Sequence, residues 1–183
     1  MGNWLTASEA LAFWQSPDSR TLTGKRNRAM LAILLGCGLR RRELAELTLE
    51  SLQRREERWA IVDLVGKGRH IRTVPVPNWV KETLDAWLAA AGISNGPLFR
   101  CVCRAGKLWG HGISEKTVWH VVKKAATNMN IAQLAPRSSK IMCTIVPRRW
   151  WRARTDPVPS WTCLSANDRT LHWLQATFED RCE

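Results

Sequence analysis

The 183-residue sequence contains no tyrosine and 3 phenylalanines, so its 11 tryptophans supply most of the aromatic side chains. The absence of tyrosine excludes any reaction in which this chain itself supplies a phenolic nucleophile. The longest apolar run, residues 30–35, is too short to cross a bilayer, and no membrane partner is expected. The first residues lack the charged and apolar regions of a signal peptide. The sequence therefore predicts a cytoplasmic protein whose six cysteines are thiols.

Acidic side chains are scarce, because 16 Asp and Glu stand against 28 Lys and Arg, which gives a formal net charge of +12. Residues 1–136 hold 20 cationic and 11 anionic side chains, whereas residues 137–183 hold 8 and 5. The positive charge thus belongs mainly to the first part. Such an excess favours a polyanionic partner, nucleic acid first, although a plain basic surface gives the same composition.

Two familiar kinds of site are also missing. The glycines at 66 and 68 do not have the spacing of a phosphate-binding P-loop, so nucleotide hydrolysis has no support. Cys101 and Cys103, with His111 nearby, are too closely spaced for an ordinary pair of zinc ligands, and no second pair follows. We therefore interpret these cysteines as structural thiols and expect no metal or other cofactor.

The periodicity of apolar residues predicts a mostly α protein with a small antiparallel β-sheet. A capping box of Thr6 and Glu9 opens the first helix, and Thr23 or Gly24 precedes the second, which ends at the glycines 36 and 38. Expected helices cover residues 6–14, 24–35, 41–47, 78–88 and 114–126, and a hairpin pairs residues 59–64 with 70–76. After residue 136 no helical or alternating pattern persists for more than a few residues.

Two basic motifs could carry chemistry. Residues 38–44 read GLRRREL and place Arg40, Arg41 and Arg42 at a helix start, where planar guanidinium groups match phosphate oxygens. Residues 65–72 read VGKGRHIR and place Lys67 at a hairpin tip, where it can contact a phosphate or donate a proton. Taken singly, the arginine motif is better explained by a solvated cationic turn, and the second motif can be a plain glycine turn.

Read together, the motifs make residues 4–136 resemble the catalytic domain of tyrosine recombinases, the phage integrase family. RTVPVP at 72–77, GPLF at 96–99 and the helix after Ser114 follow in the family's order. The resemblance implies the fold of these DNA breaking and rejoining enzymes. It also implies that Arg40 holds the scissile phosphate of duplex DNA, that Glu43 supports the turn, and that Lys67 donates a proton to the leaving 5′ oxygen. The DNA contacts that we expect are Arg40, Arg41, Arg42, Lys67, Arg69, Arg72 and Lys116.

The family next needs a His-x-x-Arg motif, a Leu-Gly-His motif and a nucleophilic tyrosine, and this sequence has none of them. The departure is abrupt after residue 136. Read one nucleotide later, codons allowed for residues 159–171 can spell Leu-Leu-Gly-His-Val-Ser-x-Gln-Thr-Thr-Glu-Arg-Tyr. We therefore interpret residues 137–183 as a poorly structured, out-of-frame tail after a frameshift near codons 133–136. Helix residues such as Val121 and Ala125 are then expected to be partly uncovered. The helical DNA-clamping domain that usually precedes the catalytic domain is also absent from this sequence.

Three functions follow from this interpretation. The first is a defective integrase or recombinase from a mobile element, associated with the nucleoid, inactive in strand transfer, and a homo-oligomer on DNA if it functions. The second is a non-enzymatic basic remnant that binds DNA. The third is an unrelated basic helical protein that binds RNA or another protein.

Overall fold

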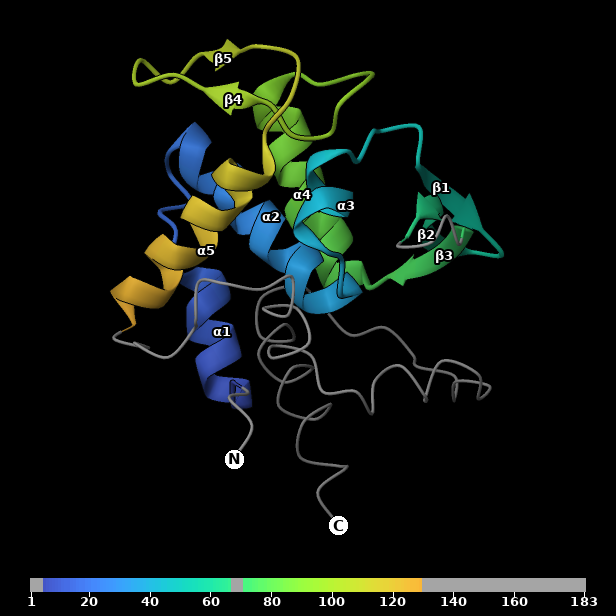
Figure 1. Ribbon diagram of the computed structural model, residues 1–183, viewed down its shortest axis with the longest axis horizontal. Coiled ribbons are helices and arrows are strands. Elements are labelled where there is room, and N and C mark those ends of the chain that lie inside the picture. The colour runs from blue at the N-terminus through green and yellow to red at the C-terminus, as the bar shows by residue number, and fades with distance from the viewer. Residues whose placement is uncertain (1–4, 67–70, 130–183) are drawn as a thin grey trace.

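The computed structural model describes residues 5–66 and 71–129 (Figure 1). The expectations for Lys67, Arg69 and residues 137–183 lie outside these described residues. In chain order the elements are α1 (Ala7–Gln15), α2 (Leu22–Cys37), α3 (Arg41–Ala45), β1 (Leu52–Arg55), β2 (Arg58–Val65), β3 (Ile71–Val76), α4 (Asn78–Ala91), β4 (Cys101–Val102), β5 (Leu108–Trp109) and α5 (Glu115–Asn128). The predicted class, mostly α with small antiparallel sheets, is confirmed.

The first helix begins as its sequence predicts. The Thr6 hydroxyl accepts a hydrogen bond from the Glu9 amide at 3.3 Å, and Glu9 Oε2 accepts one from the Thr6 amide at 2.7 Å. This capping box satisfies two amides that the first helical turn leaves unpaired.

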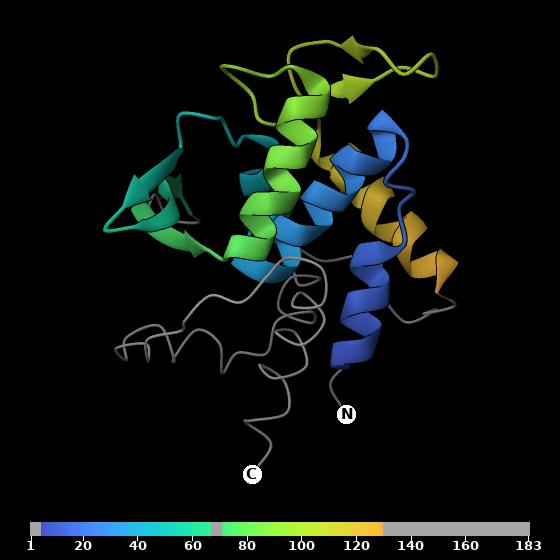
Figure 2. The same cartoon turned by 180° about the vertical axis from the view of Figure 1, so that it is seen from behind.

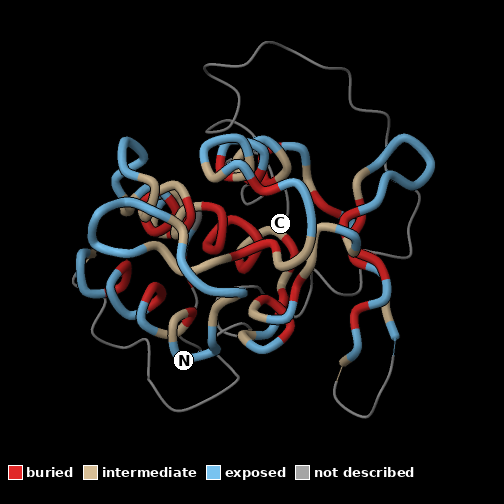
Figure 3. The backbone as a smooth tube through the Cα atoms, turned by 90° about the horizontal axis from the view of Figure 1, so that it is seen from above, coloured by how far each residue is buried: buried red, intermediate tan, exposed pale blue. Residues whose placement is uncertain are grey.

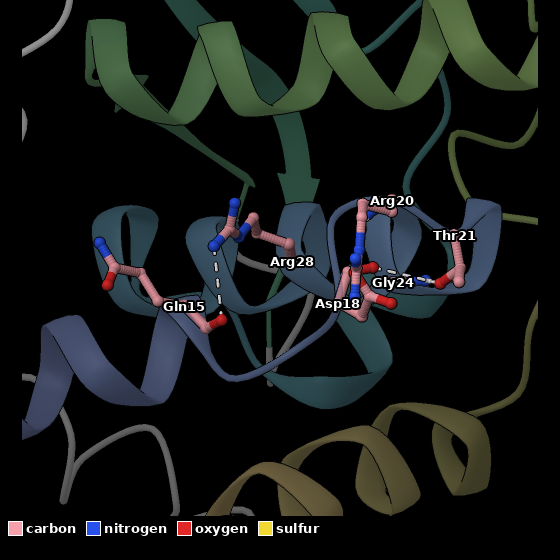
Figure 4. A network of polar contacts seen from close by, with 6 residues as sticks. All are labelled: Gln15, Asp18, Arg20, Thr21, Gly24 and Arg28. Carbon is pink, nitrogen blue, oxygen red and sulfur yellow. Dashed lines mark hydrogen bonds and ion pairs between the residues drawn. The ribbon is translucent and has the colours of Figure 1, made fainter.

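The second helix begins earlier than expected. Its cap is Thr21, whose hydroxyl accepts a hydrogen bond from the Gly24 amide at 3.0 Å (Figure 4). Gly24 lies in the first turn, where a larger residue would clash, because the Asp18 carbonyl oxygen would stand 1.7 Å from a Cβ at this position. Arg28 Nη2, one turn further on, donates to the Gln15 carbonyl at 3.4 Å and ties α1 to α2. The helix ends at Gly38, which takes the left-handed conformation (φ 63°) that glycine adopts without strain.

Helix α2 lies at the centre of the core. Figure 2 shows α4 covering one side of it, and Figure 1 shows α3 and α5 on the other. The contact with α4 is close at Gly36, where a Cβ would meet Val80 Cγ2 at 2.5 Å. Val121 and Ala125 on α5 are buried, so the expectation that they are partly uncovered is wrong. Contacts of α5 with α1, α2 and α3 account for this burial.

The predicted hairpin forms, and β1 adds a third antiparallel strand that the sequence did not reveal. β1 was missed because residues 53–55 are polar and exposed, leaving Leu52 as its only buried side chain. The pair β4–β5 was missed because each strand has two residues. Figure 3 shows the buried residues in the interior of the helical body and the hairpin turns exposed at its edges. In the described part of the chain, no helix has both the length and the apolar character needed to span a bilayer.

Candidate nucleic-acid interface

Three consecutive arginines open α3 and have different environments. Arg40 is the N-cap residue, and its side chain is 45% exposed. The guanidinium of Arg41 lies over the Trp119 ring on α5, 6.0 Å from the ring centroid. The exposed Arg42 donates from Nε to Glu46 Oε1 at 2.7 Å, and this hydrogen bond raises the pKa of Arg42 above its ordinary value. Arg40 and Arg42 are therefore accessible, whereas Arg41 is held against a neighbouring helix.

Glu43 fixes the position of Arg40. Its carboxylate is buried, with 5% of the side chain exposed, and a buried charge is tolerated only when donors surround it. Oε2 accepts from the Arg40 backbone amide at 2.7 Å, and Oε1 accepts from Arg40 Nη1 at 3.3 Å. The carboxylate thus holds both the backbone and the guanidinium of Arg40 at the start of α3.

Arg72 reaches the same carboxylate from the sheet. Its Nη2 donates to Glu43 Oε2 at 2.7 Å, and its side chain is 23% exposed. This contact ties β3 to α3, and β2 and β3 flank residues 67–70. Arg72 was expected to contact DNA, and the structure places it in an ion pair with Glu43. No sequence pattern indicates this pair, because its members lie 29 positions apart and no helical or strand register relates them.

The start of α5 lies beside α3. The Ser114 hydroxyl caps the helix by accepting from the Thr117 amide at 3.2 Å, as predicted. Lys116 is exposed in the first turn. The charge of Glu115 contributes to the raised pKa of Arg42, and Arg41 packs on Trp119, so the two helices meet at this end. Figure 1 shows both helices in front of α4. The structure therefore gathers Arg40, Arg41, Arg42, Arg72 and the helix that bears Lys116.

The candidate zinc ligands do not form a cluster. Cys101 Sγ donates to the Gly112 carbonyl at 3.3 Å, and Cys101 and Cys103 are thiols outside any disulfide, as expected for these two. Within residues 5–66 and 71–129, no three His, Cys, Asp or Glu side chains are grouped in a way that could hold a metal ion.

Comparison with known proteins identifies the family to which this chain is similar. A sequence model described as "Phage integrase family" matches residues 3–141. Tyrosine recombinase XerD of Pseudomonas putida is 31% identical over 124 residues, which cover 67% of this chain and 40% of that protein. Tyrosine recombinase XerC of Myxococcus xanthus is 40% identical over 88 residues, covering 48% of this chain and 28% of that protein.

Solved structures agree on the fold. The XerH site-specific recombinase bound to its difH substrate superposes with a TM-score of 0.61 at 17% identity, over 84% of this chain and 44% of that one. The XerA recombinase superposes with a TM-score of 0.55 at 17% identity, over 78% and 47%.

The chain belongs to the phage integrase family of tyrosine recombinases. It spans about two fifths of the length of the Pseudomonas putida relative.

Proposed function

We propose that residues 4–136 form a recombinase catalytic-type domain that binds the phosphates of duplex DNA. The observation that carries this proposal is the arrangement around Glu43, which holds Arg40 at the start of α3 and joins it to Arg72 on the hairpin. A guanidinium fixed in this way meets a phosphate without first losing much conformational freedom. The XerH structure, a complex with its DNA substrate, supports DNA as the partner.

In the proposed site Arg40 donates hydrogen bonds to the non-bridging oxygens of one phosphate and neutralises charge that develops there. Lys67 is the general acid that protonates the leaving 5′ oxygen, a role it takes from the family resemblance. Arg41, Arg42, Arg69 and Lys116 contact flanking phosphates. Arg72 acts through Glu43 as a positioning residue. This chemistry needs no metal ion or nucleotide.

We further propose that this chain does not complete strand cleavage. Cleavage in the family requires a tyrosine hydroxyl to attack the phosphate, and none of the 183 residues is a tyrosine. The family match, which ends at residue 141, supports our assignment of residues 137–183 to an out-of-frame tail. The protein is then a defective copy from a mobile element, localised with the nucleoid through its affinity for DNA.

A second candidate is a present-day role as a DNA-binding protein without catalysis. The same observation favours it, because Arg40 keeps its ordered support from Glu43 while the sequence offers no nucleophile. Such a protein would compete with an active recombinase for the same duplex, singly or as a homo-oligomer on DNA.

Binding of a labelled duplex of mixed sequence, measured by fluorescence anisotropy over a salt series, tests the proposal. Phosphate-dominated, non-specific binding has dissociation constants on the order of 10⁻⁴ to 10⁻⁶ M at physiological salt. We expect values in that range and a logarithmic affinity that falls linearly with the logarithm of salt concentration. Absence of binding at low salt, or binding that salt does not weaken, would overturn the proposal. A nicked or covalently linked product from a duplex substrate would overturn the assignment as catalytically defective.

A further inference from the structure

Trp109 is the one large aromatic side chain that the described fold leaves in solvent. Its exposed fraction is 72%, whereas Trp14, Trp79 and Trp87 are buried. The partly buried Trp59 and Trp119 each lie against a cationic side chain, Lys81 and Arg41. An exposed indole ring is a large apolar surface with a polar edge, a combination that is enriched at binding interfaces.

The strand register explains why Trp109 faces outward. β4 and β5 pair antiparallel, with Cys101 opposite Trp109 and Val102 opposite Leu108. Val102 and Leu108 pack against the core, so their neighbours in each strand point to the opposite face. Lys107, two residues before Trp109, belongs to that outer face and is also exposed. The ring and the ammonium group are thus presented on the same side of the hairpin.

The charged side chains in the stretch of chain that contains this hairpin have one sign. Residues 86–114 contain Arg100, Arg104 and Lys107 and no Asp or Glu. Arg104 and Lys107 lie in the exposed turn that joins the strands. An outward aromatic ring beside cations, without a carboxylate in the same stretch, suits a partner that combines negative charge with flat apolar surfaces. Nucleic acid has both, in its phosphates and its sugars and bases.

The hairpin is also joined to the proposed interface by a short segment. Residues 110–114 lead directly from β5 into α5, whose first turn lies beside α3. Figure 1 shows this connection passing in front of the helical body, on the side where α3 and α5 are seen. A duplex held by the α3 arginines can therefore continue toward the β4–β5 hairpin.

We propose that the β4–β5 hairpin (residues 101–109) is a second DNA contact, in which Trp109 packs against a nucleotide's sugar and base while Arg104 and Lys107 bind the flanking phosphates. This inference rests on the proposed DNA binding. It extends the interface beyond the basic motifs at residues 38–44 and 65–72.

The aromatic contact of Trp109 and the ionic contacts of Arg104 and Lys107 affect the salt dependence of binding differently. The anisotropy assay can therefore test the inference. W109A should weaken binding about tenfold at every salt concentration and leave the salt slope unchanged, because an apolar contact releases no counterion. W109F should recover part of the loss. K107A and R104A should each lower the magnitude of the salt slope by roughly one unit. R20A, which removes an exposed charge from the α1–α2 connection, is the matched control and should leave the slope unchanged.

Circular dichroism and thermal unfolding establish that each variant folds. We expect all of them to fold, because the replaced side chains are exposed and their loss removes no core packing. If W109A and the wild type bind DNA with equal affinity, this inference is overturned and the proposed function still stands. Absence of wild-type binding would overturn both. A W109A effect that W109F does not relieve would also contradict the role of an aromatic ring.

Discussion

Arg72 on β3 and Glu43 on α3 form a 2.7 Å ion pair between the hairpin and the helix that presents Arg40. The buried Glu43 carboxylate also accepts from the Arg40 amide and guanidinium. One acidic side chain therefore sets the mutual position of two basic motifs that are far apart in sequence. Because both arginines depend on it, Glu43 links the stability of the domain to the geometry of its phosphate-binding surface.

Replacing Glu43 by Gln should lower the free energy of unfolding by about 2 kcal/mol, because it removes the buried charge that two guanidinium groups face. The matched control is E46Q, which disrupts the solvent-exposed Arg42–Glu46 pair and should have little measurable effect. Urea denaturation followed by circular dichroism gives both values. Equal losses for the two variants would contradict the structural role of Glu43.

Replacing Arg40 by Ala should weaken DNA binding. The slope of log affinity against log salt concentration should fall in magnitude by roughly one unit, as expected for the loss of one phosphate contact. R42A should act in the same direction but less strongly, because Glu46 already engages its guanidinium. The measurement is the anisotropy titration over a salt series, with R20A as the charge-matched control. An R40A variant with unchanged slope would remove Arg40 from the interface.

The backbone of the turn between β1 and β2 is strained, and a substitution can relieve the strain. Glu56 and Glu57 form a two-residue connection with φ values of 45° and 64°, a conformation that favours Asn-Gly. The substitution E57G should stabilise the protein by about 1 kcal/mol, because glycine adopts this backbone without a steric penalty. E57A removes the same charge but keeps a Cβ, so it should give no such gain. Thermal unfolding distinguishes the two, and equal effects would assign the change to charge instead.

Acid should abolish the contribution of Glu50 to stability. A hydrogen bond from the Gly96 amide to Oε1, 2.8 Å long, is the main reason that the pKa of Glu50 lies below its ordinary value of 4.5. Because the pKa of Glu50 is lower in the folded state, the carboxylate contributes to the free energy of unfolding above pH 4.5. This contribution is lost as the pH falls through the pKa of Glu50 in the folded protein. Wild type should therefore be more stable than E50Q at pH 7, and the difference should shrink as the pH falls below 4.5. Urea midpoints at pH 7 and over an acidic pH series test this, with E82Q on α4 as a control.

The proposed frameshift predicts the nucleotide sequence across codons 130–183. Read one nucleotide later from codons 133–136, it should encode a His-x-x-Arg motif, a Leu-Gly-His motif and a tyrosine near position 171. A protein made from the restored frame, once a DNA-clamping domain is supplied, should form a covalent link to a duplex recombination substrate, which denaturing electrophoresis detects. A restored frame without that tyrosine would refute the frameshift.

Much of the local structure was predictable from contiguous residues alone. The Thr6 and Ser114 caps start their helices where the residues predict, because a hydroxyl that accepts from a nearby amide depends only on neighbours in the chain. Gly38 ends α2 for an equally local reason, a backbone conformation with positive φ. The residues that carry the family resemblance, GLRRREL and the glycine hairpin, were likewise readable because each is contiguous.

Features that depend on distant partners could be seen only in the folded protein. The sequence could not show that Arg72 pairs with Glu43, that Arg41 rests on Trp119, or that β1 joins the sheet, because each needs segments that only folding brings together. It could not separate the exposed Trp109 from the buried Trp87 either. Composition and periodicity report what a residue prefers on average, whereas packing against particular neighbours decides which side chain is buried, which is paired and which remains free to meet a partner.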